Sequence, residues 1–188
     1  RICLIPAFFA TSLLISAIRN PLFPMVLLVP LALGYGYTVG SERLVALLGS
    51  RRLKETFVGK NLAISIGWAM VPALLLFAYE RIFTTTAAVL SIFLFLRAFV
   101  NSVFCDIRDL AGDIKVGLRT LPSVLGVNRT LSFLLIVTVL TGIFIPACVA
   151  LGLLPSPAYF LTVGIVYGCL YLLASRRRNA DMNRLCDV

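Results

Sequence analysis

The stretch LSFLLIVTVLTGIFIPACVALGL, residues 131–153, has no charged side chain and is as long as a helix that crosses a lipid bilayer. Five further apolar runs lie at residues 2–18, 21–39, 61–79, 86–104 and 158–174. Membrane-spanning strands alternate polar and apolar side chains, and these runs do not. Because 60% of the 188 residues are hydrophobic, the sequence predicts an all-α, polytopic transmembrane helix bundle with about six spans.

Basic residues are distributed unequally between the links that join these runs. If the spans alternate across the membrane, Arg1 and the links 40–60, 105–130 and 175–188 fall on one side. That side carries fourteen Lys and Arg residues, whereas the other carries only Arg19 and Arg81. Because Lys and Arg are retained on the cytoplasmic side, we expect the long links and both chain ends to be cytoplasmic.

Composition excludes several classes of protein. The net charge of +9 does not indicate nucleic-acid binding, because the basic residues lie in short links and form no basic–aromatic motif. The five cysteines form no C-x-x-C pair and the chain has no histidine, so no zinc site and no disulfide framework are implied. We expect membrane lipid as a partner and no nucleic acid.

The most informative polar segment is NSVFCDIRDLAGDIKVGLRTLP, residues 101–122, which holds three of the eight acidic residues. Ser102, Asp106, Asp109 and Asp113 are spaced i, i+4, i+7 and i+11, so they lie within about 60° of one another on one helix face. Stacked carboxylates repel one another unless a cation compensates. Mg²⁺ typically takes one or two carboxylates together with water and phosphate oxygens. The spacing therefore predicts a Mg²⁺ site.

Basic residues accompany these carboxylates on the same predicted side of the membrane. They are Arg108, Lys115 and Arg119 in the same segment, and Arg51, Arg52, Lys54 and Lys60 in the preceding link. A diphosphate requires such an arrangement, because metal ions and basic side chains neutralise the charge that develops as it leaves. The apolar spans are able to enclose a long hydrocarbon tail.

The run from Asp106 to Asp113, continued by Lys115, Gly117 and Arg-Thr-Leu-Pro at 119–122, resembles the second aspartate-rich motif of the UbiA-type prenyltransferase superfamily. Residues 50–55, SRRLKE, through Lys60 and Asn61 resemble the basic segment of that family. The motif resemblance covers roughly residues 40–130, and hydropathy alone carries it further. It implies Mg²⁺-dependent transfer of a polyprenyl group from polyprenyl diphosphate to a hydrophobic or aromatic acceptor within the membrane.

The resemblance also implies roles for particular residues. The catalytic metal ligands would be Asp106, Asp109 and Asp113. The diphosphate would be bound by Lys54, Lys60, Arg108, Lys115 and Arg119. Further possible substrate contacts are Arg52, Asn61, Asn101 and Ser102. The acceptor stays open, since a quinone precursor, a glycerol-phosphate lipid and a tetrapyrrole all suit the same diphosphate site.

The chain departs from the family pattern in two ways. The family has nine spans and a first aspartate-rich motif, Asn-Asp-x-x-Asp, after its second span, and this sequence contains no such motif. We therefore expect residues 1–188 to form a single transmembrane prenyltransferase domain, truncated at both ends and inactive by itself. The family also often has Tyr-Ser where this chain reads Gly49-Ser50, so that tyrosine is absent.

Arg97 lies inside the apolar run 86–104, four residues before Asn101. A charged Arg costs at least about 2.5–3.5 kcal/mol at the centre of a membrane helix, so it should face the bundle interior or water. Because it is out of phase with the acidic residues, we favour structural pairing over substrate contact.

Three alternatives to the transferase remain open. A six-span membrane transporter or channel without transferase activity is the first, although transporters usually place ionisable groups near the bilayer midplane. A non-catalytic membrane scaffold is the second. The third is that the acidic segment is simply a solvated cytoplasmic loop with surface charge pairs.

Overall fold

The structure, a computed structural model, describes residues 58–80 and 84–186, together with Thr11 and residues 17–18. The predicted spans 2–18 and 21–39 lie almost entirely outside the described residues. The described part contains helices and no strand, as predicted. Its elements are α4 (Gly59–Glu80), α5 (Thr85–Val116), α6 (Leu121–Leu125), α7 (Val127–Ala150), the 3₁₀ helix η2 (Ser156–Phe160) and α8 (Leu161–Cys186).

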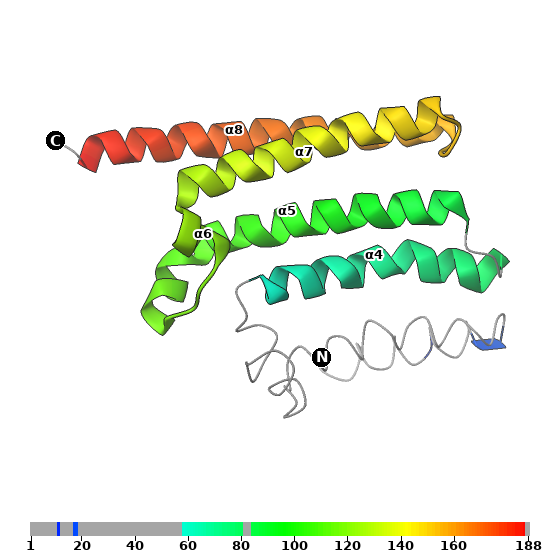
Figure 1. Ribbon diagram of the computed structural model, residues 1–188, viewed down its shortest axis with the longest axis horizontal. Coiled ribbons are helices and arrows are strands. Elements are labelled where there is room, and N and C mark those ends of the chain that lie inside the picture. The colour runs from blue at the N-terminus through cyan, green and yellow to red at the C-terminus, as the bar shows by residue number, and fades with distance from the viewer. Residues whose placement is uncertain (1–10, 12–16, 19–57, 81–83, 187–188) are drawn as a thin grey trace.

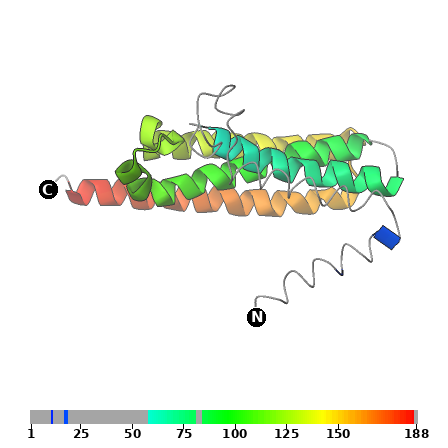
Figure 2. The same cartoon turned by 90° about the horizontal axis from the view of Figure 1, so that it is seen from below.

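Four long helices lie side by side along one axis (Figures 1 and 2). Helix α4 packs on α5, α5 packs on α7, and α7 packs on α8. The short helix α6 contacts both α5 and α7. In Figure 1, α4 begins, α5 ends and α7 begins at the same end of the bundle, where α6 also lies. The links around residues 58 and 117–126 therefore share one end, as the alternation of spans requires.

Three of the predicted spans are confirmed as helices of membrane-crossing length. Thr85–Val116, Val127–Ala150 and Ser156–Arg178 are each long and apolar enough, and Gly59–Leu75 of α4 is a shorter apolar helix. Only 28%, 28% and 11% of the most apolar windows of the three long segments is buried inside the protein. Lipid is the solvent that favours so much exposed apolar surface on helices. The chain is an integral membrane protein.

Helix α5 is longer than the apolar run that predicts it. Thr84 caps its N-terminus with a hydroxyl that accepts a hydrogen bond from the Ala87 amide at 3.2 Å. Gly117 caps its C-terminus in a left-handed conformation with φ of 73°. Its 32 residues span about 48 Å, compared with about 30 Å for the hydrocarbon core of a bilayer. About a third of the helix therefore extends beyond that core, and we place its acidic C-terminal third there.

Two apolar clusters hold α5 against α7 and α8. The first consists of Val89, Phe93, Ile145, Cys148, Leu154 and Ile165. The second consists of Val100, Val103, Leu131, Leu134 and Leu172. On the opposite side α5 packs on α4. Helix α5 is thus fixed on both sides, and this fixes the positions of the acidic residues on its last turns.

Candidate active site

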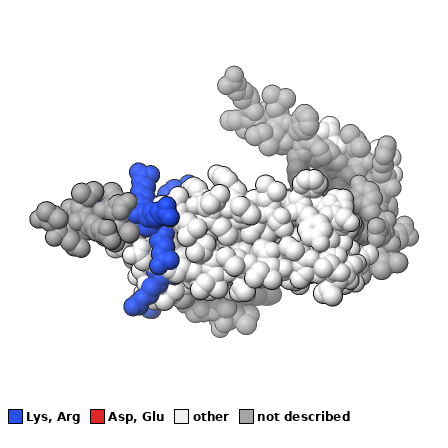
Figure 3. Space-filling model, turned by 90° about the horizontal axis from the view of Figure 1, so that it is seen from above, with Lys and Arg blue, Asp and Glu red and all other residues white. Residues whose placement is uncertain are grey.

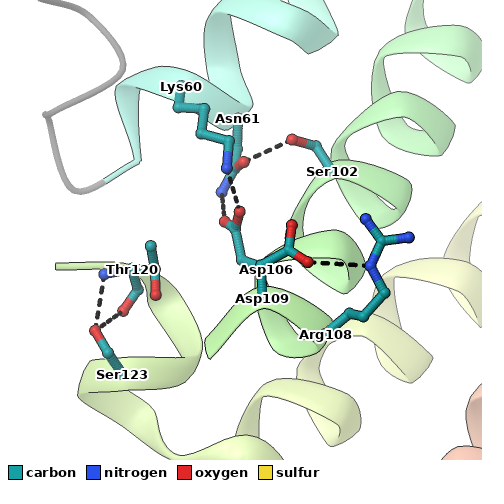
Figure 4. A network of polar contacts seen from close by, with 8 residues as sticks. All are labelled: Lys60, Asn61, Ser102, Asp106, Arg108, Asp109, Thr120 and Ser123. Carbon is teal, nitrogen blue, oxygen red and sulfur yellow. Dashed lines mark hydrogen bonds and ion pairs between the residues drawn. The ribbon is translucent and has the colours of Figure 1, made fainter. Parts of the chain in front are cut away.

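The first turn of α4 meets α5 at a partly buried ion pair. Lys60 Nζ lies 2.7 Å from Asp106 Oδ1, and Asn61 Nδ2 donates a hydrogen bond to Asp106 Oδ2 at 2.9 Å. The Asp106 side chain is 1% exposed and that of Lys60 is 30% exposed. A carboxylate at this place is favoured because the N-terminus of a helix carries partial positive charge. Figure 4 shows the Asp106 carboxylate pointing toward both residues of α4.

Asn61 extends this contact into a buried polar network. Ser102 Oγ, on α5, donates to Asn61 Oδ1 at 2.6 Å, and Ser65 Oγ donates to the Asn61 main-chain carbonyl. Asn61, Ser65 and Ser102 are all buried. Buried polar groups are costly unless hydrogen bonded, so this set of partners fixes the orientation of the Asn61 amide and the register of α4 on α5.

Asp109, one turn after Asp106, has a different environment. Its carboxylate is 52% exposed and receives a hydrogen bond from Arg108 Nε at 3.1 Å, and Arg108 itself is 72% exposed. In Figure 4 the Asp109 carboxylate points toward Arg108, not toward α4. An exposed pair between neighbouring residues restrains the carboxylate only weakly. Asp109 is accessible to a ligand in a way that Asp106 is not.

Asp113 lies at the last turn of α5. Its main-chain carbonyl accepts hydrogen bonds from the amides of Gly117 and Leu118, which ends the helix. Its side-chain Oδ2 is buried and has no hydrogen-bond partner among the described residues. A buried carboxylate oxygen without a partner is unusual in proteins and calls for a donor or a cation.

The residues after Gly117 turn the chain into α6. Thr120 begins this helix with its main-chain amide donating to Ser123 Oγ at 2.8 Å, and Ser123 Oγ donates back to the Thr120 carbonyl. The Thr120 side chain is buried, and its Oγ1 also lacks a partner in the described part of the chain. The segment Gly-x-Arg-Thr-Leu-Pro at 117–122 therefore has a structural role, because it ends α5 and begins α6.

Exposed basic side chains gather at the end of the bundle that carries these acidic residues. In Figure 3, which shows one face, Lys and Arg form a band toward one end while the rest of the described surface of that face is neutral. The exposed basic residues of the described part are Arg108, Lys115, Arg119, Arg129, Arg176, Arg177 and Arg178. This confinement of charge agrees with the predicted sidedness, and positive charge at that end suits an anionic substrate.

The chain matches the UbiA prenyltransferase family over residues 2–185. It belongs to that family. It is also 31% identical over 137 residues to a protein from Pyrococcus abyssi (strain GE5 / Orsay) named digeranylgeranylglyceryl phosphate synthase, in an alignment that covers 68% of this chain and 49% of that protein. The chain thus spans about half the length of that curated relative. No solved structure matches it.

Membership of the UbiA prenyltransferase family confirms the resemblance found in the acidic motif. It favours a transferase over the transporter or channel that hydropathy alone allows.

The structure brings four of the predicted site residues together, namely Lys60, Asn61, Ser102 and Asp106. Asn101 is exposed and makes no contact that joins it to this group, whereas Arg52 and Lys54 lie outside the described residues.

The three carboxylates predicted to bind metal share α5 but not one environment. Within residues 58–80 and 84–186, no three His, Cys, Asp or Glu side chains come together as a ligand set. Asp109 and Asp113 nevertheless fit a divalent ion, since one offers an accessible carboxylate and the other a buried oxygen that has no partner in the described part of the chain. Two carboxylates completed by water and phosphate oxygens are a usual environment for Mg²⁺.

Ser65 is a polar residue of the network that was not predicted from the sequence. Its spacing of four residues from Asn61 within an apolar run is the signal that could have found it.

Arg97 lies within the apolar part of α5. Its Nη1 atom is buried without a hydrogen-bond partner among the described residues. Its guanidinium packs over Gly168 of α8, where a Cβ would lie 3.0 Å from Nη1. Arg97 therefore faces the bundle, as its cost in lipid requires.

Proposed function

We propose that the full-length protein is an intramembrane prenyltransferase that transfers a polyprenyl group from its diphosphate to a lipid-soluble or aromatic acceptor. The observation that carries this proposal is the Lys60–Asp106 contact of 2.7 Å. It joins the end of the basic segment, which forms the first turn of α4, to the acidic segment of α5, and these are the two segments that the sequence associates with a diphosphate. The family membership supports the same activity.

We propose Asp109 and Asp113 as ligands of Mg²⁺. Their spacing of four residues places their Cβ atoms about 5–6 Å apart on one helix face, and both offer the hard oxygen atoms that this ion prefers. When bound, Mg²⁺ supplies charge neutralisation for the departing diphosphate. Asp106 belongs to the same site through its contacts with Lys60 and Asn61.

The basic residues act on the diphosphate directly. Lys60, Lys115 and Arg119 lie at the same end of the bundle and donate to phosphate oxygens. Further positive charge comes from Arg108, Lys54 and Arg52. These cations stabilise the negative charge that grows as the bond between the prenyl carbon and oxygen breaks. The acceptor attacks the allylic carbon and loses a proton, and the apolar helices exclude the water that would compete with it.

A glycerol-phosphate lipid is the first acceptor to test. The Pyrococcus abyssi relative is named as a synthase of digeranylgeranylglyceryl phosphate, and the alignment with it covers 68% of this chain. We also place this site on the cytoplasmic side, because fourteen of the Lys and Arg residues fall on the side of the links 40–60 and 105–130.

The test uses the full-length protein reconstituted in liposomes with radiolabelled geranylgeranyl diphosphate. Geranylgeranylglyceryl phosphate and 4-hydroxybenzoate are supplied as acceptors in parallel reactions, each with Mg²⁺ or with EDTA. We expect label to enter the glyceryl phosphate lipid with Mg²⁺ and not with EDTA. Label in neither acceptor, or equal transfer with EDTA, contradicts the proposal, whereas label only in the aromatic acid corrects the acceptor alone.

A further inference from the structure

Asp106 differs from the other two acidic residues of α5 in having both carboxylate oxygens engaged. Oδ1 accepts from Lys60 Nζ at 2.7 Å and Oδ2 accepts from Asn61 Nδ2 at 2.9 Å. The side chain is 1% exposed, against 52% for Asp109. Mg²⁺ loses its water reluctantly and usually keeps several water molecules when a protein binds it. The Asp106 carboxylate, 1% exposed and with both oxygens engaged, therefore offers no accessible oxygen to a hydrated ion.

The hydrogen bonds around Asp106 run in one direction, from donor to acceptor, through three residues. A carboxylate only accepts, so Asn61 must turn its amide nitrogen toward Asp106 and its oxygen toward Ser102. Ser102 Oγ then donates to Asn61 Oδ1 at 2.6 Å. The network is therefore complete without a metal ion, and it holds the Asp106 carboxylate in one orientation.

Lys60 connects this buried network to the accessible end of the bundle. Its ammonium group contacts a buried carboxylate, yet 30% of its side chain is exposed. A lysine side chain is long and loses considerable rotamer freedom when it is held in one place. A carboxylate that fixes the ammonium group before the substrate arrives lowers the cost of binding an anion there.

We infer that Asp106 is a positioning residue, which holds Lys60 in place for the diphosphate and does not bind Mg²⁺. This inference rests on the proposed function, because it takes Lys60 as a diphosphate ligand. It divides the acidic residues of α5 into two groups. Asp109 and Asp113 bind the metal ion, and Asp106 holds Lys60 in place for the diphosphate in the same site.

The substitution Asp106→Asn separates the two roles while keeping the shape of the side chain. The amide nitrogen of the new asparagine side chain would face a hydrogen-bond donor, either Lys60 or Asn61. The Asn61 amide can turn over to accept it, because the Ser102 hydroxyl can accept as well as donate. The fold is thus retained, but the charge that holds Lys60 is lost.

The experiment measures radiolabelled prenyl transfer by the full-length protein against Mg²⁺ concentration and its inhibition by inorganic pyrophosphate. For Asp106→Asn we expect the Mg²⁺ midpoint to stay within about twofold of the wild type and the pyrophosphate inhibition constant to rise about tenfold or more, as for a lost charge-assisted contact. Lys60→Gln should raise the same inhibition constant. The constant of the double variant should be no higher than that of the more strongly affected single variant, because the two residues act as one unit.

Asp109→Asn is the matched comparison, since it makes the same change one turn later and should raise the Mg²⁺ midpoint. An Mg²⁺ midpoint raised equally by Asp106→Asn and Asp109→Asn would overturn the inference, as would additive losses in the double variant. If Asp106→Asn does not fold, Asp106→Glu, whose longer side chain moves the carboxylate out of its place beside Lys60, gives the same two readouts. The proposed function fails separately, if the wild type shows no Mg²⁺-dependent transfer.

Discussion

Replacing Asp106 with alanine removes the acceptor of one buried and one partly buried hydrogen bond, and its effect on stability can be compared with the same change at Asp109. At Asp106 the substitution leaves Asn61 Nδ2 buried without an acceptor and Lys60 Nζ without its carboxylate. Breaking a buried ion pair costs about 3–5 kcal/mol. Because Lys60 is 30% exposed and can regain water, we expect a loss of about 2–4 kcal/mol in the free energy of unfolding.

Asp109→Ala should have no measurable effect on unfolding, because Asp109 and Arg108 are 52% and 72% exposed and an exposed pair contributes little. The assay is reversible unfolding of the full-length protein in mixed micelles of a mild detergent and SDS, followed by far-UV circular dichroism. The two variants share a helix, a residue type and a substitution, so they differ chiefly in burial. Equal losses in both, or a loss below about 1 kcal/mol for Asp106→Ala, would contradict a stabilising role for the contacts of Asp106 with α4.

Three further predictions follow from other parts of the structure. Gly168→Leu should destabilise the protein by about 1–3 kcal/mol because it displaces the Arg97 guanidinium. Gly168→Ala should be milder, because the flexible end of Arg97 can move. Equal effects of the two substitutions in the same unfolding assay would contradict the packing of Arg97 over Gly168. Gly117→Val should lower the free energy of unfolding by about 1–2 kcal/mol, because φ of Gly117 is 73°. Gly117→Asn should be tolerated better, because asparagine adopts the left-handed conformation more easily. Identical stabilities of the two variants would be inconsistent with this turn. A cysteine introduced at Lys115, in a background without the native cysteines, should react with a membrane-impermeant maleimide only from the cytoplasmic face; reaction only from the outside would reverse the orientation.

Helical periodicity predicted which residues share the acidic face of α5 but not how that face is covered. The four residues of that face do lie on one helix, as their spacing predicts: Ser102, Asp106, Asp109 and Asp113. Whether a neighbouring helix buries one carboxylate and leaves the next exposed depends on where α4 begins. Helix α4 begins at Gly59, so that Lys60 and Asn61 reach Asp106 while Asp109 stays exposed.

The end of α5 shows a second limit of sequence interpretation. Hydropathy ends the predicted span at residue 104, because the following residues are polar. The helix continues to Val116 since hydrophobicity is not what ends a helix. Gly117 does so, with the left-handed conformation that glycine adopts most easily. The extra turns carry all three acidic residues, and this places them past the expected hydrocarbon boundary on a rigid element.

We propose that the protein transfers a prenyl group with the help of Asp109 and Asp113. The most direct measurement is the rate of radiolabelled geranylgeranyl transfer by the full-length protein at saturating substrate, in the wild type, Asp109→Asn and Asp113→Asn. We expect Mg²⁺-dependent transfer in the wild type and a loss of at least about a hundredfold in each variant, with unfolding stability retained. Turnover near the wild-type rate in both variants would contradict it.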